Sequence, residues 1–212
     1  MGAEDLYNGR TFAFAAESAR ANSVFVQASL YEKAMPENGA TDRLGYNTAI
    51  LVSPTGGLVA RVRKMHIPNS EGYHERTYLR PGPCRSDPYP VYAPHGLGAR
   101  IGLPSWDQWF PEVARTYALH GAEIVIYPSA IGSEPSFPKF DSESQWRQVI
   151  VANGIANGLF MIVPNRTGDE GKLRFRGRLS CRTPTIGCCC AHRVTRKRCW
   201  SPTSTSISAA TG

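Results

Sequence analysis

One stretch of the chain has residue types and a spacing that could carry out nucleophilic chemistry. It is Gly102–Glu112, Gly-Leu-Pro-Ser-Trp-Asp-Gln-Trp-Phe-Pro-Glu, with an apolar strand before it and a helical pattern after it. A tight turn between a strand and a helix presents a side chain at the helix N-terminus, where the dipole favours negative charge. Ser105 stands in that turn. Asp107 and Glu112 fit equally well a simple pair of stabilising charges at the start of the helix.

Two further polar residues lie upstream of this stretch. Lys64 follows an apolar strand in the segment Val62–Pro68, and Glu75 lies in the segment Gly72–Gly82. A lysine at the end of a strand is most simply a solvated side chain, and His66 beside it is most simply a loop residue that forms hydrogen bonds. Neither segment identifies a site on its own.

Taken together, the three segments resemble the nitrilase, or carbon–nitrogen hydrolase, superfamily, and most closely its N-carbamoylputrescine amidase and β-ureidopropionase-like branch. Tyr127-Pro128, Ala130–Pro135 and Asn165-Arg166 fit the same branch, and the likeness covers about residues 10–175. The resemblance implies a mixed α/β fold, a four-layer α-β-β-α sandwich. It also implies hydrolysis of a linear N-carbamoyl or amide substrate through a covalent thioester-type intermediate.

The resemblance gives each segment a role. Lys64 matches the catalytic lysine that stabilises the oxyanion, and Glu75 matches a second glutamate that positions the lysine and the substrate. Backbone N–H groups near Trp106 would complete the oxyanion site. The residues expected at the oxyanion site or in the substrate pocket are Trp106, Asp107, Tyr127 and Ala130.

Two parts of the family's catalytic set are missing from this sequence. The branch has a cysteine directly before its Trp-Asp-Gln-Trp-Phe-Pro-Glu run, but here Ser105 precedes Trp106, and Gly102 is one residue closer than usual. The cysteine has either dropped out or been exchanged for serine. The family's first glutamate, a general base, precedes the helix at which this chain begins, and Glu4 has the wrong context to replace it. We therefore expect an N-terminally truncated, impaired enzyme. The alternative is a non-catalytic binding or subunit-interaction module.

Hydrophobic periodicity predicts the elements that must position these residues. The predicted helices are residues 10–21, 110–120 and 142–157, and the predicted strands are 23–31, 47–52, 58–62, 99–103, 123–127 and 160–163. The turn Ser53–Gly57 predicts a hairpin, and residues 66–90 read as a long loop. The alternation of strands and helices after residue 99 predicts an α/β sheet with helices on its outer faces.

The bulk composition is that of an ordinary globular domain. The 212 residues are 42% hydrophobic and 19% charged, enough for one sizeable core, and residues 1–175 are predicted to form one partial hydrolase domain. No apolar run is long enough to span a bilayer and no signal segment is visible, which predicts a cytoplasmic protein without a membrane partner. The resemblance implies a small-molecule substrate, a homo-oligomer, no metal and no cofactor.

Residues 176–212 form a tail that differs from the rest of the chain. The net charge is +7, yet residues 171–212 hold nine basic residues and no acidic one, which leaves 15 basic against 17 acidic residues elsewhere. Five of the six cysteines lie there too, but no Cys-x-x-Cys pair favours zinc, and the scarcity of aromatic residues argues against nucleic acid. Because the tail lacks hydrophobic periodicity, we predict that it is disordered. The abrupt change in charge and cysteine content predicts a frameshift near Arg176.

Overall fold

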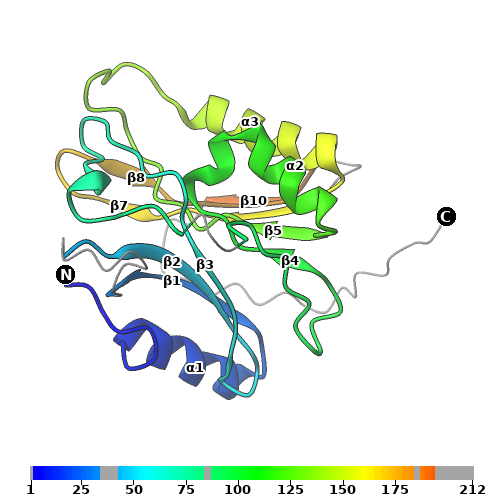
Figure 1. Cartoon of the computed structure of the whole chain (residues 1–212). Coiled ribbons are helices and arrows are strands. Elements are labelled where there is room, and N and C mark those ends of the chain that lie inside the picture. Colours follow the sequence, from blue (N-terminus) through cyan, green and yellow to red (C-terminus); the bar gives the residue numbers. More distant parts are fainter. Residues whose placement is uncertain (1, 34–42, 84–86, 184–186, 194–212) are drawn as a thin grey trace.

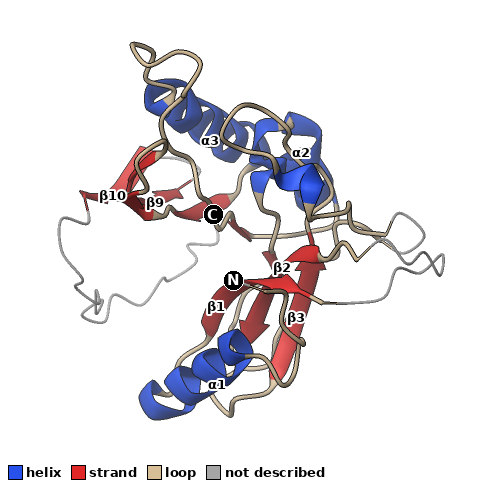
Figure 2. Ribbon diagram, turned by 90° about the vertical axis from the view of Figure 1, so that its left-hand side faces the viewer, coloured by secondary structure: helices blue, strands red, loops and turns tan. Residues whose placement is uncertain are grey.

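The computed structural model of the chain describes residues 2–33, 43–83, 87–183 and 187–193. Its elements form four layers (Figure 1): α1 (Arg10–Asn22), a three-stranded sheet, a five-stranded sheet, and a helical layer of α2 (Pro111–Leu119) and α3 (Glu143–Asn157). The turned view in Figure 2 shows α1 on the opposite side of the molecule from α2 and α3. The mixed α/β class is confirmed, and the layers follow the expected α-β-β-α order.

The smaller sheet is antiparallel, in the order β1-β2-β3. Its strands are β1 (Val26–Glu32), β2 (Tyr46–Val52) and β3 (Leu58–Arg63). The predicted hairpin joins β2 to β3 through a tight turn, in which the N–H of Gly56 donates to the carbonyl of Ser53 at 2.8 Å. Gly56 has φ +83°, a backbone conformation that favours glycine.

The larger sheet carries the parallel part of the fold, in the order β10-β9-β6-β5-β4. Strands β4, β5 and β6 are parallel, and α2 and α3 form the crossover connections between them. The strands of this sheet are β4 (Ile101–Gly102), β5 (Ile124–Ile126), β6 (Phe160–Pro164), β9 (Arg178–Thr183) and β10 (Gly187–Arg193). The carboxyl ends of the parallel strands therefore meet at one edge, where α/β proteins commonly bind ligands.

Part of the tail that was predicted to be disordered forms two strands, β9 and β10. Strand β9 pairs antiparallel with β6, and β10 pairs with β9. The open edge of β6 offers unpaired backbone groups to any following segment, whatever its side chains, so strand pairing does not require hydrophobic periodicity. Residues 184–186 and 194–212 of the tail lie outside the described residues. The frameshift near Arg176 stays a prediction.

Several short elements were not predicted. A 3₁₀ helix, η2 (Trp106–Trp109), separates β4 from α2, and α2 begins only at Pro111, a favoured residue for a first helical position. A second 3₁₀ turn, η1 (Glu75–Thr77), lies within the expected long loop. A small hairpin of β7 (Thr167–Asp169) and β8 (Arg174–Arg176) follows β6.

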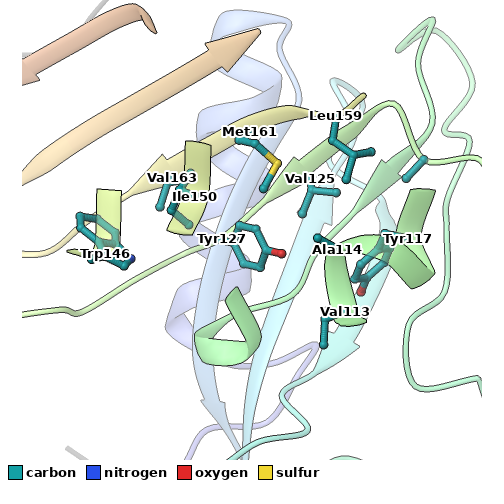
Figure 3. Packing of buried hydrophobic residues seen from close by; sticks show 11 residues of the cluster. Val113, Ala114, Tyr117, Val125, Tyr127, Trp146, Ile150, Leu159, Met161 and Val163 are labelled. Atoms are coloured by element: carbon teal, nitrogen blue, oxygen red, sulfur yellow. The ribbon is translucent and has the colours of Figure 1, made fainter. Parts of the chain in front are cut away.

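Three buried clusters hold the layers together. Ala15, Ala16 and Ala19 of α1 allow that helix to pack closely on the smaller sheet. A second cluster, including Leu51 and Leu103, fills the space between the two sheets. Figure 3 shows the third cluster, in which α2 and α3 cover the outer face of the larger sheet, with the labelled residues Val113, Ala114, Tyr117, Val125, Tyr127, Trp146, Ile150, Leu159, Met161 and Val163.

One contact fixes how closely α2 approaches the sheet. A Cβ atom placed on Gly102 would lie 2.4 Å from a ring carbon of Tyr117, which is fully buried. Only glycine therefore allows α2 to pack at its present distance from β4. Among the described helices, none is long and apolar enough to cross a membrane.

Candidate active site

A cavity of about 420 Å³ opens at the carboxyl ends of the parallel strands, between the two sheets. Ser29 of β1 and Asn47 of β2 line it from the smaller sheet, and the segments that follow β3, β4, β5 and β6 form the rest of the wall. The lining residues are Ser29, Asn47, Lys64, Pro68, Ser70, Tyr73, Glu75, Ser105, Trp106, Gln108, Trp109, Pro128, Ser129, Ala130, Ile131, Glu134 and Arg166. Among them are five of the predicted site residues.

The two charged residues predicted upstream meet at this cavity. The Nζ of Lys64 lies 2.5 Å from Oε2 of Glu75, and the lysine side chain is only 2% exposed. Burial lowers the pKa of Lys64 below its ordinary value, and the carboxylates of Glu75 and Asp107 oppose that shift by favouring the ammonium form. The site therefore holds a buried amine whose charge depends on its carboxylate neighbours.

The turn after β4 places Ser105 on the cavity wall beside these charges. Ser105 directly precedes η2 and is largely buried, and its Oγ donates a hydrogen bond to the carbonyl of Pro128 at 3.3 Å. Sequence reasoning placed this residue in a tight turn that leads directly into the helix. The structure instead puts a separate 3₁₀ turn there, so α2 begins six residues after Ser105 and its dipole is not directed at the serine from the adjacent residue.

Of the residues expected at the oxyanion site or in the pocket, Trp106 and Ala130 line the cavity, but Asp107 does not. Asp107 is 1% exposed and accepts hydrogen bonds from the segment after Lys64: from the backbone N–H of His66 at 2.9 Å and of Met65 at 3.4 Å. Its Oδ1 also lies 2.5 Å from Nδ1 of His66. Successive residues of a tight turn point in different directions, so adjacency to Trp106 did not bring Asp107 to the cavity wall.

The structure places Tyr127, another predicted pocket residue, in the core under α2 and α3 (Figure 3). The reason is strand alternation: Val125 and Tyr127 face the helices, whereas Ile124 and Ile126 face the other sheet. Burial raises the pKa of the Tyr127 phenol far above its ordinary value. Of the two neighbours Tyr127 and Pro128, only Pro128 lines the cavity.

Sequence reasoning missed three ionisable residues on the cavity wall: Tyr73, Glu134 and Arg166. Tyr73 joins two loops, because its hydroxyl accepts from the N–H of Gly132 at 3.0 Å and donates to the carbonyl of Ser133 at 3.2 Å. Burial raises the pKa of this tyrosine. Glu134 and Arg166 lie within motifs that fit the family pattern, and this was the only sequence signal for them.

Arg166 is brought to the cavity by pairing of the loops after β5 and β6. A parallel bridge joins Ser129 to Asn165, and the side chain of Asn165 holds both the N–H and the carbonyl of Ile131, at 2.8 and 2.9 Å. The guanidinium of Arg166 stacks over the ring of Phe175 and pairs with Glu170 near the surface. The cavity thus combines a buried Lys–Glu pair with an acidic and a basic group elsewhere on its wall.

Glu4 has a structural role away from this cavity. Its carboxylate accepts hydrogen bonds from the N–H and the hydroxyl of Thr11, at 2.9 and 2.5 Å, in the first turn of α1. This satisfies a helix-start N–H group that Gly9 cannot cap with a side chain. Within the described part of the chain, no cluster of His, Cys, Asp and Glu side chains could hold a metal ion.

A second cavity, of about 710 Å³, lies on the other side of the turn that carries Ser105. Trp106 and Pro68 line both cavities and therefore belong to the wall between them. His66 and Phe110 line the second cavity, and their rings stack with centroids 3.8 Å apart.

Comparison with known sequences places the chain among hydrolases. The family described as carbon-nitrogen hydrolase matches residues 2–181. A citrullinase from Francisella tularensis is 41% identical over 126 residues, which are 59% of this chain and 42% of the relative. An N-carbamoylputrescine amidase from Arabidopsis thaliana is 36% identical over 164 residues, 77% of this chain and 51% of the relative. The chain spans about half the length of these curated relatives.

Comparison with solved structures agrees with the sequence matches. The crystal structure of a carbon-nitrogen hydrolase from Helicobacter pylori G27 is similar to this chain, with a TM-score of 0.73 and 31% sequence identity. The similarity covers 86% of this chain and 62% of that one.

Proposed function

This chain belongs to the carbon–nitrogen hydrolase family, and from that premise we propose that its cavity binds a linear N-carbamoyl or amide compound, but that turnover in this chain is impaired. The observation that carries the proposal is the ion pair between buried Lys64 and partly buried Glu75, which lines the cavity together with Ser105. Such a pair is costly to bury, and it supports a site that must stabilise negative charge.

In the proposed reaction, a nucleophile attacks the substrate carbonyl carbon, and the carbonyl oxygen becomes an oxyanion. The ammonium of Lys64 stabilises that charge, and Glu75 keeps the lysine charged and oriented. The C–N bond then breaks, the leaving nitrogen takes a proton, and water hydrolyses the acyl intermediate. This is the Glu-Lys-Cys chemistry that the family resemblance implies.

The nucleophile is the weak part of this chain. The hydroxyl of Ser105 donates a hydrogen bond to the carbonyl of Pro128, which cannot act as a general base to activate it. A serine hydroxyl is also far less acidic than a thiol. The described residues that line the cavity include no cysteine. We propose that a cysteine was lost at or directly after Ser105, by exchange or by deletion.

The charged groups farther along the wall support a particular substrate class. The relatives are named for N-carbamoylputrescine and citrulline, which both carry a ureido group at one end and an ammonium group at the other. Glu134 would bind that ammonium, and Arg166 would bind the extra carboxylate of citrulline. We therefore propose a linear ureido compound with a cationic end as the ligand.

A second candidate function is a binding or subunit-interaction module without catalysis. The hydrogen bond from Ser105 to Pro128 favours it, because it engages the only hydroxyl in the described nucleophile turn. Both functions share the same cavity, so ligand binding alone does not separate them.

The test measures binding by calorimetry and ammonia release for the unaltered chain, Ser105→Cys, and a variant with a cysteine inserted between Ser105 and Trp106. We expect N-carbamoylputrescine or citrulline to bind all three, and ammonia release to rise at least tenfold in one cysteine variant. Adding Lys64→Met to the active variant should abolish the gain. Binding without any gain would favour the non-catalytic module, and absence of binding to every variant would contradict both functions.

A further inference from the structure

A buried carboxylate outside the substrate cavity joins the two segments that carry the functional groups. Met65 and His66 directly follow Lys64, and Asp107 lies two residues after Ser105. The Asp107 carboxylate accepts from both backbone N–H groups, at 3.4 and 2.9 Å, and contacts Nδ1 of the His66 ring at 2.5 Å. One side chain thus fixes the end of β3 against η2.

The surroundings of Asp107 hold this arrangement in place. The carboxylate is 1% exposed, whereas the side chain of His66 is 38% exposed and closes over it. The ring of His66 stacks on Phe110, at an interplanar angle of 18°, and Phe110 itself follows η2. A buried carboxylate needs several donors to offset its desolvation, and these contacts supply them.

Asp107 also acts on Lys64 through space. The buried ammonium is opposed by desolvation, and the negative charges of Glu75 and Asp107 both favour it. Asp107 therefore has two effects on the same lysine, one through the backbone that it anchors and one through its charge.

We propose that Asp107 and His66 form a positioning link, which sets Lys64 against the nucleophile turn. The inference rests on the proposed function for the meaning of the site, but it concerns residues that do not touch the substrate. Asp107 is a positioning residue in this scheme.

The experiment follows the titration of the Lys64 amine by NMR in ¹⁵N-lysine protein, with Lys64→Met used to assign the signal. In Asp107→Asn, which keeps the side-chain shape and removes the charge, we expect titration at lower pH than in the unaltered chain. Affinity for N-carbamoylputrescine should fall about tenfold, because a displaced and less fully charged Lys64 weakens the charge-assisted hydrogen bond that it donates to the ligand. Glu112→Gln is the matched control, because it removes an exposed carboxylate from the first turn of α2 and should change neither quantity.

An unchanged Lys64 titration in a folded Asp107→Asn protein would overturn the inference. If that variant does not fold, His66→Ala removes the exposed half of the link and keeps the buried charge. That variant should speed amide hydrogen exchange at positions 65 and 66, and unchanged exchange there would equally overturn the inference. Failure of the proposed function looks different: no ligand binds the unaltered chain, while the Lys64 titration still moves in Asp107→Asn.

Discussion

At the scale of single residues, the site depends on a lysine that is buried and yet surrounded by carboxylates. Lys64 is 2% exposed and contacts Glu75, whose side chain is 20% exposed and keeps partial access to water. Desolvation is the largest influence on the lysine and lowers its pKa from 10.5. Its ionisation should therefore be visible in the pH dependence of stability.

Replacement of Lys64 by Met should remove a pH-dependent contribution to the free energy of unfolding. Between the lowered pKa of Lys64 in the folded chain and the ordinary value in the unfolded chain, the unfolded state binds the additional proton, so the stability of the unaltered protein rises with pH. Lys64→Met lacks this rise. Denaturant unfolding gives the free energy of unfolding of both proteins at several pH values. Toward pH 10, the value for Lys64→Met should fall relative to that of the unaltered protein, by at most about 1.4 kcal/mol per pH unit. A difference that stays constant with pH would contradict the prediction.

Replacement of Glu134 by Gln should discriminate between ligands. If Glu134 binds an ammonium group at the far end of the cavity, Glu134→Gln loses a charge-assisted hydrogen bond with a cationic ureido ligand, at a cost of about 1.5–3 kcal/mol. A neutral alkyl urea of the same length should bind both proteins alike. Calorimetry with the two ligands checks this prediction. An equal loss of affinity for both ligands would show that Glu134 shapes the cavity wall but does not recognise the charge of the ligand.

Sequence reasoning singled out cavity residues that lie inside contiguous motifs. Lys64, Glu75 and Ser105 were predicted and do line one cavity. Glu134 and Arg166 were not singled out, because they reach the cavity through pairing of loops far apart in the chain, which no local spacing reveals. The roles of the residues that line the cavity stay predictions until variants are measured.

At the scale of elements, the close contact between α2 and β4 leaves no room for a side chain on Gly102. Gly102 lies in β4, three residues before Ser105, so a shift of α2 would be transmitted to the nucleophile turn. Gly102→Ala should destabilise the protein by about 1–3 kcal/mol, as overpacking of a close-packed core does. Thermal unfolding against Gly2→Ala, where a Cβ meets nothing within 4 Å, is the matched comparison. Equal stability of both variants would show that Tyr117 can move aside freely.

Most helices and strands could be predicted because they are amphipathic or apolar over several turns or residues. The helix expected at 10–21 is α1, and that expected at 142–157 is α3, each within one residue at either end. The missed elements are short: η2 has four residues and β7 is wholly exposed, so neither produces a periodic pattern. They are set by tertiary contacts, and η2 by the hydrogen bonds of Asp107.

At the scale of the whole molecule, the basic, cysteine-rich tail contrasts with an acidic body. We propose that the gene is read in a shifted frame from near Arg176, which would explain why charge and cysteine content change together. The strand pairing of β9 and β10 does not argue against this, because it uses backbone groups alone. Resequencing the gene should reveal the shift, and an uninterrupted frame through that codon would refute it.

The shared wall between the two cavities has a spectroscopic consequence. Of the four tryptophans of the chain, Trp106 lines both cavities, Trp109 lines the cavity that Lys64 also lines, and Trp146 is buried in the core. Indole emission shifts in wavelength with the polarity around the ring, so a molecule in the second cavity should change the emission of Trp106 and leave that of Trp146 constant. A molecule in the first cavity should change the emission of Trp106 and Trp109. The protein thus carries its own optical reporter of occupancy, and Trp106→Phe should silence it for the second cavity.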